Sequence, residues 1–260
     1  MRALAALVVL AFPAVAPAEP TAPAASAAVW RPTAPYVTAG QDEPGYRNWY
    51  MASPVHPIRV RAFNDYLAAN GVGGVVPTWQ LIRTASDWWK CGGQPFEVPP
   101  TEHWPNIVHA LRFIGAFIEP AIGDVEPVSA YRNPALNACA GGAATSTHLT
   151  GGGVDMVPNR PITREALMVA LCRIQLASGN WNGIGLGLYK GVRFHVDARK
   201  FREWGMAGAR GGFGCAAVLT EGPMPYPEDT AKGVSDINSN ARPAKAPGVA
   251  QDETGLGPEI

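Results

Sequence analysis

The chain has 260 residues, of which 47% are hydrophobic and 16% are charged, so it is long enough to bury one full-sized core. Lysine plus arginine number 21, and aspartate plus glutamate also number 21. Because this balance leaves no excess of positive charge, the composition argues against a nucleic-acid partner and against an anionic membrane surface. A small uncharged or zwitterionic partner is at least as compatible with it.

The chain opens with MRALAALVVLAFPAVAPAEP, in which Arg2 precedes a short apolar run that ends in the small-residue pattern Ala-Pro-Ala. This arrangement predicts a secretory signal peptide over residues 1–18, with cleavage before Glu19 and export to the periplasm or the extracellular space. A membrane anchor is the alternative. Pro13 interrupts the apolar run, however, and the run is shorter than the roughly 20 residues that span a bilayer. We therefore expect no stable membrane insertion.

Two further segments are poor in large apolar side chains. Residues 19–40 are rich in alanine, proline and threonine, and residues 222–260 mix proline, glycine, aspartate and lysine with almost no aromatics. Such segments cannot bury enough surface to order themselves, so we expect a disordered linker and a disordered C-terminal tail. Residues 41–221 are expected to form one catalytic domain, which acts as a monomer.

Apolar residues at helical spacing predict several amphipathic helices between these segments. The positions are Val60, Phe63 and Leu67; Trp79, Ile82 and Trp89; Ile107, Leu111, Ile114 and Ile118; and Leu167, Leu171 and Ile174. Pro77 and Thr78 suit the start of the second helix, Thr163 suits the cap of the last, and Gly71 and Gly179 suit helix ends.

Four stretches are better interpreted as strands, because they are short, partly β-branched or aromatic, and bounded by glycine or proline. They are residues 125–132, 152–157, 183–189 and 193–198. Helices therefore come first along the chain, and a small sheet with one inserted helix follows. This order indicates an α+β domain.

The four cysteines are Cys91, Cys139, Cys172 and Cys215, and no CxxC pair occurs among them. Their scatter argues against a zinc knuckle or a thioredoxin-like site. An even number in an exported chain predicts two disulfides. Spacing does not choose among the three possible pairings. We favour Cys91–Cys139 with Cys172–Cys215, and the alternative leaves Cys172 as a buried free thiol on an apolar helix face.

The segment STHLTGGGVDM, residues 146–156, places His148 and Asp155 seven positions apart, and RFHVDAR supplies His195 from a separate strand. A hydrolytic zinc site takes three protein ligands from histidine and aspartate or glutamate, and keeps one position open for water. The spacing alone is a weak signal, since a histidine and an aspartate often lie this far apart by chance. A surface histidine beside a glycine-rich turn is the alternative.

Two longer stretches, SAYRNPALNACAGGAATSTHLTGGGVDMVP and GIGLGLYKGVRFHVDARKFREW, resemble the zinc peptidases of the D-alanyl-D-alanine carboxypeptidase family. That family's hallmark is Ser-x-His-x-x-Gly-x-Ala-x-Asp, followed later by a strand histidine and preceded by Tyr-Arg. The matching residues here are Tyr131, Arg132, Ser146, His148, Gly151, Gly153, Asp155 and His195, with glycine in place of alanine at 153. The resemblance covers about residues 125 to 205. The upstream stretch VVPTWQLIRTASDWWKCGGQPFEVPP looks like the helical lead-in of an exported subgroup.

This resemblance implies a hedgehog and D-Ala-D-Ala-peptidase-like fold, with a small antiparallel sheet packed with helices and a helical N-terminal lead-in. It implies that His148, Asp155 and His195 bind a zinc ion (Zn2+), which lowers the pKa of bound water and provides a nucleophile near neutral pH. Arg132 would face the oxyanion of the tetrahedral intermediate, with a surface salt bridge as the alternative. Ser146 would bind the terminal carboxylate of the substrate or orient the turn.

The sequence departs from the family pattern at the general base. Members generally carry a glutamate three positions before the last ligand or a histidine two before it, and here those positions are Val192 and Arg193. In an extended segment Arg193 and Asp197 share the face of the last ligand. Asp197 is therefore the nearest candidate for the base, or for a carboxylate that orients the ligating histidine. Glu126 and Glu203 are further candidates.

The function implied is a zinc-dependent peptidase that hydrolyses peptidoglycan stem peptides, as a D-Ala-D-Ala-type carboxypeptidase or as an endopeptidase that cuts cross-links. The stereochemistry of the substrate comes from the family and not from these residues. The missing base motivates a second hypothesis, a zinc-containing peptidoglycan-binding protein without turnover. In both cases the expected partner is a peptidoglycan peptide and not a nucleic acid.

Overall fold

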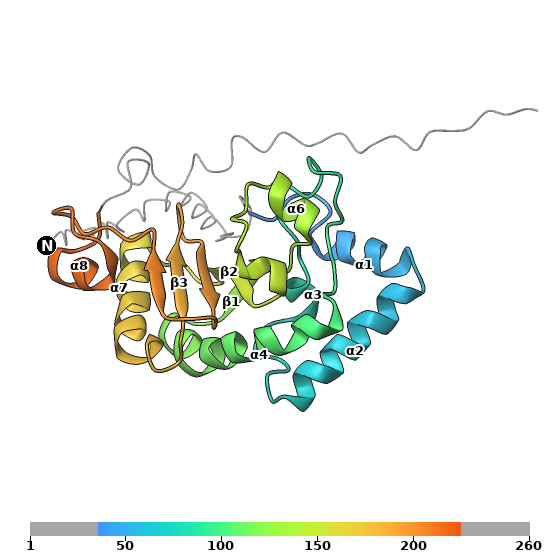
Figure 1. The fold of residues 1–260 in the computed structure, drawn as a ribbon, viewed down its shortest axis with the longest axis horizontal. Coiled ribbons are helices and arrows are strands. Elements are labelled where there is room, and N and C mark those ends of the chain that lie inside the picture. The colour runs from blue at the N-terminus through green and yellow to red at the C-terminus, as the bar shows by residue number, and fades with distance from the viewer. Residues whose placement is uncertain (1–35, 225–260) are drawn as a thin grey trace, which may run out of the picture.

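Residues 36–224 are described by a computed structural model, in which helices occupy the N-terminal half and a sheet with flanking helices the C-terminal half (Figure 1). The predicted signal peptide, most of the predicted linker and most of the predicted tail lie outside these residues. Residues 36–40, expected to belong to the linker, contact the rest of the fold. The Tyr36 hydroxyl donates a hydrogen bond to the carbonyl of Lys190 at 3.0 Å, and the Ser86 hydroxyl donates one to the carbonyl of Tyr36 at 2.5 Å.

Three helices open the described chain. They are α1 (Glu43–Met51), α2 (Val55–Ala69) and α3 (Thr78–Leu81). Helix α2 buries Val60, Phe63 and Leu67 as predicted and ends just before Gly71, which has a φ of +72°. Helix α1 was not predicted; its start is capped by Asp42, whose side chain accepts a hydrogen bond from the backbone of Gly45.

The prediction of one helix through Trp79, Ile82 and Trp89 is wrong, because α3 ends at Leu81. At Arg83 the chain forms an isolated bridge with Phe96 instead, and residues 86–92 form turns. The Arg83 side chain is buried and donates hydrogen bonds to the Gln41 carbonyl at 2.9 Å and the Pro127 carbonyl at 2.8 Å. These contacts with distant segments outweigh the local helical spacing.

A long helical segment follows, and it is continuous through a π-helical stretch. It comprises η1 (Thr101–His103), α4 (Trp104–Phe113), η2 (Ile114–Ile118) and α5 (Glu119–Ile122). The predicted apolar positions Ile107, Leu111, Ile114 and Ile118 are all buried. This stripe therefore faces the core, as its spacing predicts.

The remaining helices surround the sheet segments. They are α6 (Pro134–Cys139), η3 (Thr147–Thr150), α7 (Arg164–Ile174), η4 (Gln175–Gly179) and α8 (Gly214–Glu221). Thr163 caps α7 as predicted, because its hydroxyl accepts a hydrogen bond from the backbone of Ala166 at 3.1 Å. Helices α6 and α8 were not predicted.

The sheet has five strands in the order β1-β2-β4-β3-β5. They are β1 (Val125–Ser129), β2 (Gly153–Pro158), β3 (Gly185–Leu188), β4 (Phe194–Asp197) and β5 (Arg202–Trp204). The first four confirm the predicted strands. The expected antiparallel sheet is mixed, however, because β5 runs parallel to β3. Both edges of β4 are already paired, one with β2 and one with β3. Strand β5 therefore pairs with the remaining free edge of β3.

The two faces of the sheet differ in chemistry. On one face Val154, Phe194 and Val196 are fully buried in a core that includes Leu111 of α4 and Leu171 of α7. Side chains alternate along a strand, so the intervening residues of β2 and β4 project from the opposite face. That opposite face carries the candidate functional residues.

Two disulfides confirm the favoured pairing. Cys91 bonds to Cys139 and Cys172 bonds to Cys215, and no cysteine is free, so the free-thiol alternative is wrong. The second bond ties α7 to α8. Disulfides persist in oxidising compartments, which accords with the predicted export. Among residues 36–224, no helix is both long and apolar enough to cross a membrane.

We predict that replacing Cys172 and Cys215 together with serine lowers the free energy of unfolding by about 4 kcal/mol, the chain-entropy value for a loop of this length. The bond closes a sequence separation of 43 residues. Urea unfolding of the variant and the wild-type protein measures the difference. As a control, alkylation of the unfolded but unreduced wild-type protein should modify no cysteine. Alkylation of four thiols would contradict the prediction.

Candidate metal centre

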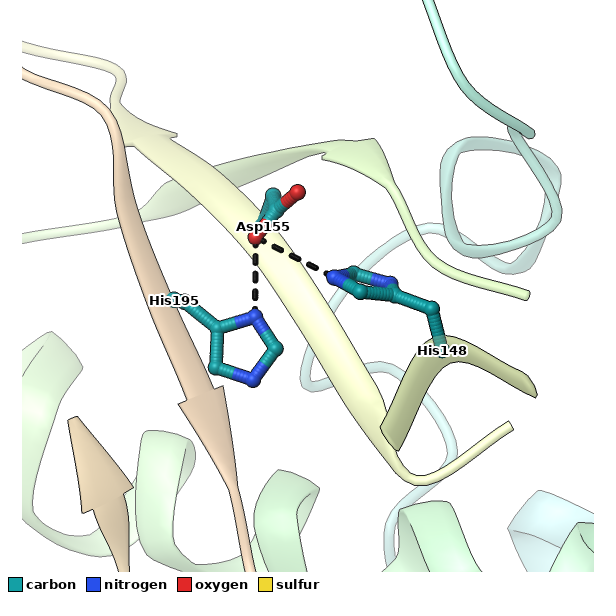
Figure 2. A group of neighbouring side chains, drawn as sticks. All are labelled: His148, Asp155 and His195. Carbon is teal, nitrogen blue, oxygen red and sulfur yellow. Dashed lines mark hydrogen bonds and ion pairs between the residues drawn. The ribbon is translucent and has the colours of Figure 1, made fainter. Parts of the chain in front are cut away.

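Three side chains predicted as metal ligands meet in the structure, although they come from three different elements. His148 lies on η3, Asp155 on β2 and His195 on β4, and Asp155 and His195 are directly paired across the two strands. One ligand atom from each lies within 4.8 Å of the other two (Figure 2). All three residues are buried.

The glycine run between His148 and Asp155 has a structural reason at two positions. Gly151 ends η3 in the left-handed conformation, with a φ of +67°, which glycine adopts without steric cost. At Gly153, a Cβ atom would lie 2.7 Å from Cε1 of His195 and 2.5 Å from the hydroxyl of Thr147. The missing side chain at Gly153 therefore lets the His195 ring lie directly against β2.

In each histidine, the ring nitrogen that points away from Asp155 is hydrogen-bonded to another residue. His148 Nδ1 is 2.5 Å from the carbonyl oxygen of Ala130, so it must carry a proton and donate it. His195 Nε2 lies 3.0 Å from a carboxylate oxygen of Asp197 and donates to it in the same way. The opposite nitrogens, His148 Nε2 and His195 Nδ1, lie 3.4 Å and 2.9 Å from Oδ1 of Asp155. These two nitrogens and Oδ1 are the atoms that could bind a metal.

The protonation states of the three residues also suit a metal. Burial lowers the pKa of His148 to about 4, so its ring is neutral at neutral pH. Burial disfavours the charged form of Asp155, but His148 and Arg193 outweigh it and hold the pKa well below its ordinary value. For His195, hydrogen bonds to Asp155 and Asp197 outweigh burial and raise the pKa. Only His195 therefore has a proton to lose when a cation binds.

The second oxygen of Asp155 is occupied by two arginines. Arg132 Nη2 donates to Oδ2 at 2.6 Å, and Arg193 Nη2 forms a short contact with the same oxygen. Arg132 is also held by the Ser129 hydroxyl, to which its Nε donates at 2.9 Å. The structure thus places Arg132 beside the candidate ligands, in an ion pair that is buried and not on the surface. Its role toward an oxyanion stays a prediction.

Asp197 contacts the side of the His195 ring that faces away from the candidate metal position. Besides His195 Nε2, its carboxylate accepts hydrogen bonds from Arg202 at 2.5 Å and 3.2 Å and from the backbone of Arg199 at 3.0 Å. It is fully buried. This position favours the orienting role over the role of general base. A base must reach a water bound to the metal, and the metal would lie at Nδ1, on the opposite side of the His195 ring.

The two other carboxylates considered as bases have partners elsewhere. Glu126 pairs with Arg83 at 2.6 Å, and Glu203 accepts a hydrogen bond from the backbone of Cys215 at 2.8 Å. In the described part of the chain, the carboxylates that hydrogen-bond to the two histidines are Asp155 and Asp197. Neither Glu126 nor Glu203 therefore hydrogen-bonds to either histidine of the site.

Ser146 lies at the start of η3, where its hydroxyl accepts a hydrogen bond from the backbone of His148 at 3.3 Å. This contact orients the turn, which is one of its two predicted roles. Ser146 also lines a hollow of about 610 Å³ together with Asn106, Thr150 and Arg199. The three candidate ligands do not line this hollow, and a role for Ser146 in substrate binding stays a prediction.

Two aromatic residues of the site were missed from the sequence. The Trp204 ring lies 5.2 Å from the His195 ring, and the Tyr189 hydroxyl is hydrogen-bonded to Trp204. Burial first, and then the nearby Asp155 charge, raise the pKa of Tyr189, so this hydroxyl keeps its proton. One sequence signal could have indicated that a bulky group packs against this strand, namely the glycines at alternate positions of GIGLGLY. A Cβ at Gly187 would lie 2.2 Å from the Trp204 ring, and glycine within a strand often marks such a close approach.

The donor set fits a divalent metal ion. Two imidazole nitrogens and one carboxylate oxygen form the three-ligand arrangement that catalytic zinc sites use, and both rings are oriented by a hydrogen bond at the other nitrogen. Comparison of the chain with protein-family models, with curated proteins and with solved structures finds no significant match. The chemistry of the site is therefore argued from its own residues.

We predict about one zinc ion per chain by elemental analysis after dialysis against zinc, as expected for a three-ligand site. Alanine at His148, Asp155 or His195 should abolish binding, because two ligands are too few to retain the ion. His109, which is exposed, provides the control variant His109→Ala. Zinc affinity should also fall as the pH is lowered, because protons then compete for His195. A full complement of zinc in His195→Ala would show that the site is assigned wrongly.

The orienting role of Asp197 predicts that Asp197→Asn weakens zinc affinity by about 10–100-fold, measured by competition with a chelating dye. Asparagine keeps the shape of the side chain but loses the charge that holds the His195 proton. As a general base, Asp197 would behave differently: zinc affinity would be unchanged and kcat would fall by roughly 10²–10⁴-fold. Unchanged affinity together with unchanged activity would exclude both roles.

Proposed function

We propose that the protein is an exported, zinc-dependent peptidase of the D-Ala-D-Ala carboxypeptidase type, acting on peptidoglycan stem peptides. The observation that carries the proposal is the convergence of His148 Nε2 and His195 Nδ1 on Oδ1 of Asp155. This set comes from the same positions that the family resemblance implies as ligands. The proposal includes the hedgehog and D-Ala-D-Ala-peptidase fold, for which the α+β architecture is the supporting observation.

A zinc ion at this position would lower the pKa of a bound water to about 7 and so supply the nucleophile. The chain's own residues provide the surroundings. The Ala130 carbonyl and Asp197 fix the two imidazole rings. Arg132 holds a positive charge beside the ligands, where negative charge develops on a scissile carbonyl oxygen. The Trp204 ring packs beside the His195 ring, which is buried.

A second candidate function is a zinc-containing peptidoglycan-binding protein without turnover. The observation in its favour is Arg193, which stands where family members generally carry a base and which pairs with Asp155. An arginine cannot accept a proton in a protein, and Glu126 and Glu203 pair with residues outside the site. Hydrolysis would then depend on the metal alone for its nucleophile.

We predict that the zinc-loaded protein releases D-alanine or split muropeptides from purified cell wall, and that a chelator stops the release. Mass spectrometry of the soluble products measures both outcomes, and His195→Ala is the matched inactive control. Retention of the protein on the cell wall without any product would support the binding protein in place of the peptidase. If the protein neither binds the wall nor changes it, both candidate functions fail.

A further inference from the structure

Arg193 and Tyr189 extend the site along the sheet face that carries His195. They face each other at the two ends of the turn between β3 and β4, where the backbone of Tyr189 donates a hydrogen bond to the Arg193 carbonyl at 3.1 Å. Arg193 is two residues from His195, and Tyr189 is two residues from Gly187, which pairs with His195. Alternation along the strands therefore puts both side chains on the face of the candidate ligands.

The turn that carries Arg193 is anchored from outside the sheet. The Tyr36 hydroxyl donates to the carbonyl of Lys190 at 3.0 Å, within the same turn. Gly191 has a φ of +66° and leaves room for this hydroxyl, which would lie 2.5 Å from a Cβ at that position. Arg193 is thus presented by a fixed turn, and a group that is held in place before binding loses less conformational entropy.

The Arg193 guanidinium has only part of its hydrogen-bonding capacity used. Its Nη2 contacts Asp155, and its plane lies over the Tyr189 ring, with Cζ 4.9 Å from the ring centre. Its Nε is buried without a hydrogen-bond partner among the described residues. The side chain is 24% exposed, against 11% for Arg132, so Arg193 is the more accessible cation on the same carboxylate.

The charged side chains around the site give it a net positive charge. Arg132 and Arg193 pair with Asp155, and Arg202 pairs with Asp197, so three cations face two carboxylates. The excess is one positive charge when the histidines are neutral, and a divalent cation at the ligands raises it to three. In a site that is largely shielded from water, such an excess strongly favours an anionic ligand.

We propose that Arg193, whose guanidinium lies over the Tyr189 ring, binds the terminal carboxylate of the peptide substrate, so that the protein removes a single C-terminal residue. This inference rests on the proposed peptidase function and selects the carboxypeptidase over the endopeptidase. Asp155 presents Oδ1 to the metal position and Oδ2 to Arg193, so one carboxylate group separates the guanidinium from the reacting centre. In a carboxypeptidase substrate, the terminal carboxylate belongs to the residue directly after the scissile bond. It is therefore about one residue from the scissile carbonyl, a spacing of roughly 3.8 Å between Cα atoms.

The reaction that follows is a simple hydrolysis. The oxygen of one water molecule bonds to the scissile carbonyl carbon, the C–N bond breaks, and the amine of the released residue takes up a proton. Arg193 takes no part in bond making. It is a specificity-determining residue, because a peptide that continues beyond this point has no carboxylate to offer.

The test compares two stem peptides that differ only at the C-terminus, one a free acid and one an amide. Calorimetry on the zinc-loaded wild-type protein should show that the acid binds about 10- to 100-fold more tightly, the range for a hydrogen bond to a charged group. Arg193→Gln should bind both peptides equally while keeping its zinc. Arg193→Lys should be intermediate, since it keeps the charge and loses the planar fork. Arg112→Gln, an exposed arginine on α4, is the matched control.

The outcomes separate the inference from the proposed function. The inference is overturned, and the peptidase proposal stands, if Arg193→Gln keeps the full preference for the free-acid peptide. The same holds if the wild-type protein binds and cleaves the amide peptide as readily as the free-acid peptide. If the wild-type protein binds neither peptide, the proposed function falls, and the inference falls with it. Loss of preference in Arg193→Gln alone, with zinc content and thermal unfolding as in the control, supports the inference.

Discussion

The buried carboxylate of Asp155 is the constraint on which the rest of the site depends. A buried charge is costly unless it is paired and hydrogen-bonded, and Asp155 satisfies this requirement with Arg132, Arg193 and His195. His148 and His195 lie at one oxygen, and Arg132 and Arg193 lie at the other. These residues come from three segments of the chain: the segment after β1, the 3-10 helix η3, and the start of β4 with the residue before it. One carboxylate on β2 therefore links three other segments of the chain.

Glycines make this concentration of charge possible on a sheet. The row that contains Asp197 has Gly153 on one neighbouring strand and Gly185 on the other. A Cβ at Gly185 would lie 2.7 Å from the Asp197 carboxylate, so the carboxylate fills the space of the missing side chain. In the next row Gly187 gives the same room to the Trp204 ring. The small residues on β2 and β3 thus admit the large polar and aromatic groups of β4 and β5.

Much of this arrangement follows from local sequence, and the rest depends on distant partners. The four strands were predictable because alternation is a local signal, and the favoured disulfide pairing agreed. The choice of His148, Asp155 and His195, which the structure brings together, came from the resemblance to a family motif and not from spacing alone. The early end of α3 was not predictable from periodicity, because it depends on the buried pairing of Arg83 with Glu126, 43 positions away. Strand β5 is only three residues long and is defined by its pairing with β3. Trp204 enters the site through that pairing, so the glycines of β3 could indicate that a bulky group approaches but not which residue it is.

Position 193 is where the sequence departs from the family that it resembles and where the site gains a cation. At position 193 the chain has an arginine that stays protonated, and that arginine uses Asp155 as its partner. This position therefore carries a fixed positive charge that attracts an anion, and no group that could accept a proton. A metal bound by His148, Asp155 and His195 adds to the same positive excess, so cation and anion would bind cooperatively, each lowering the electrostatic cost of the other. Peptide hydrolysis and tight peptide binding would both use this coupling, and they differ only in whether the nucleophile forms without help from a side-chain base.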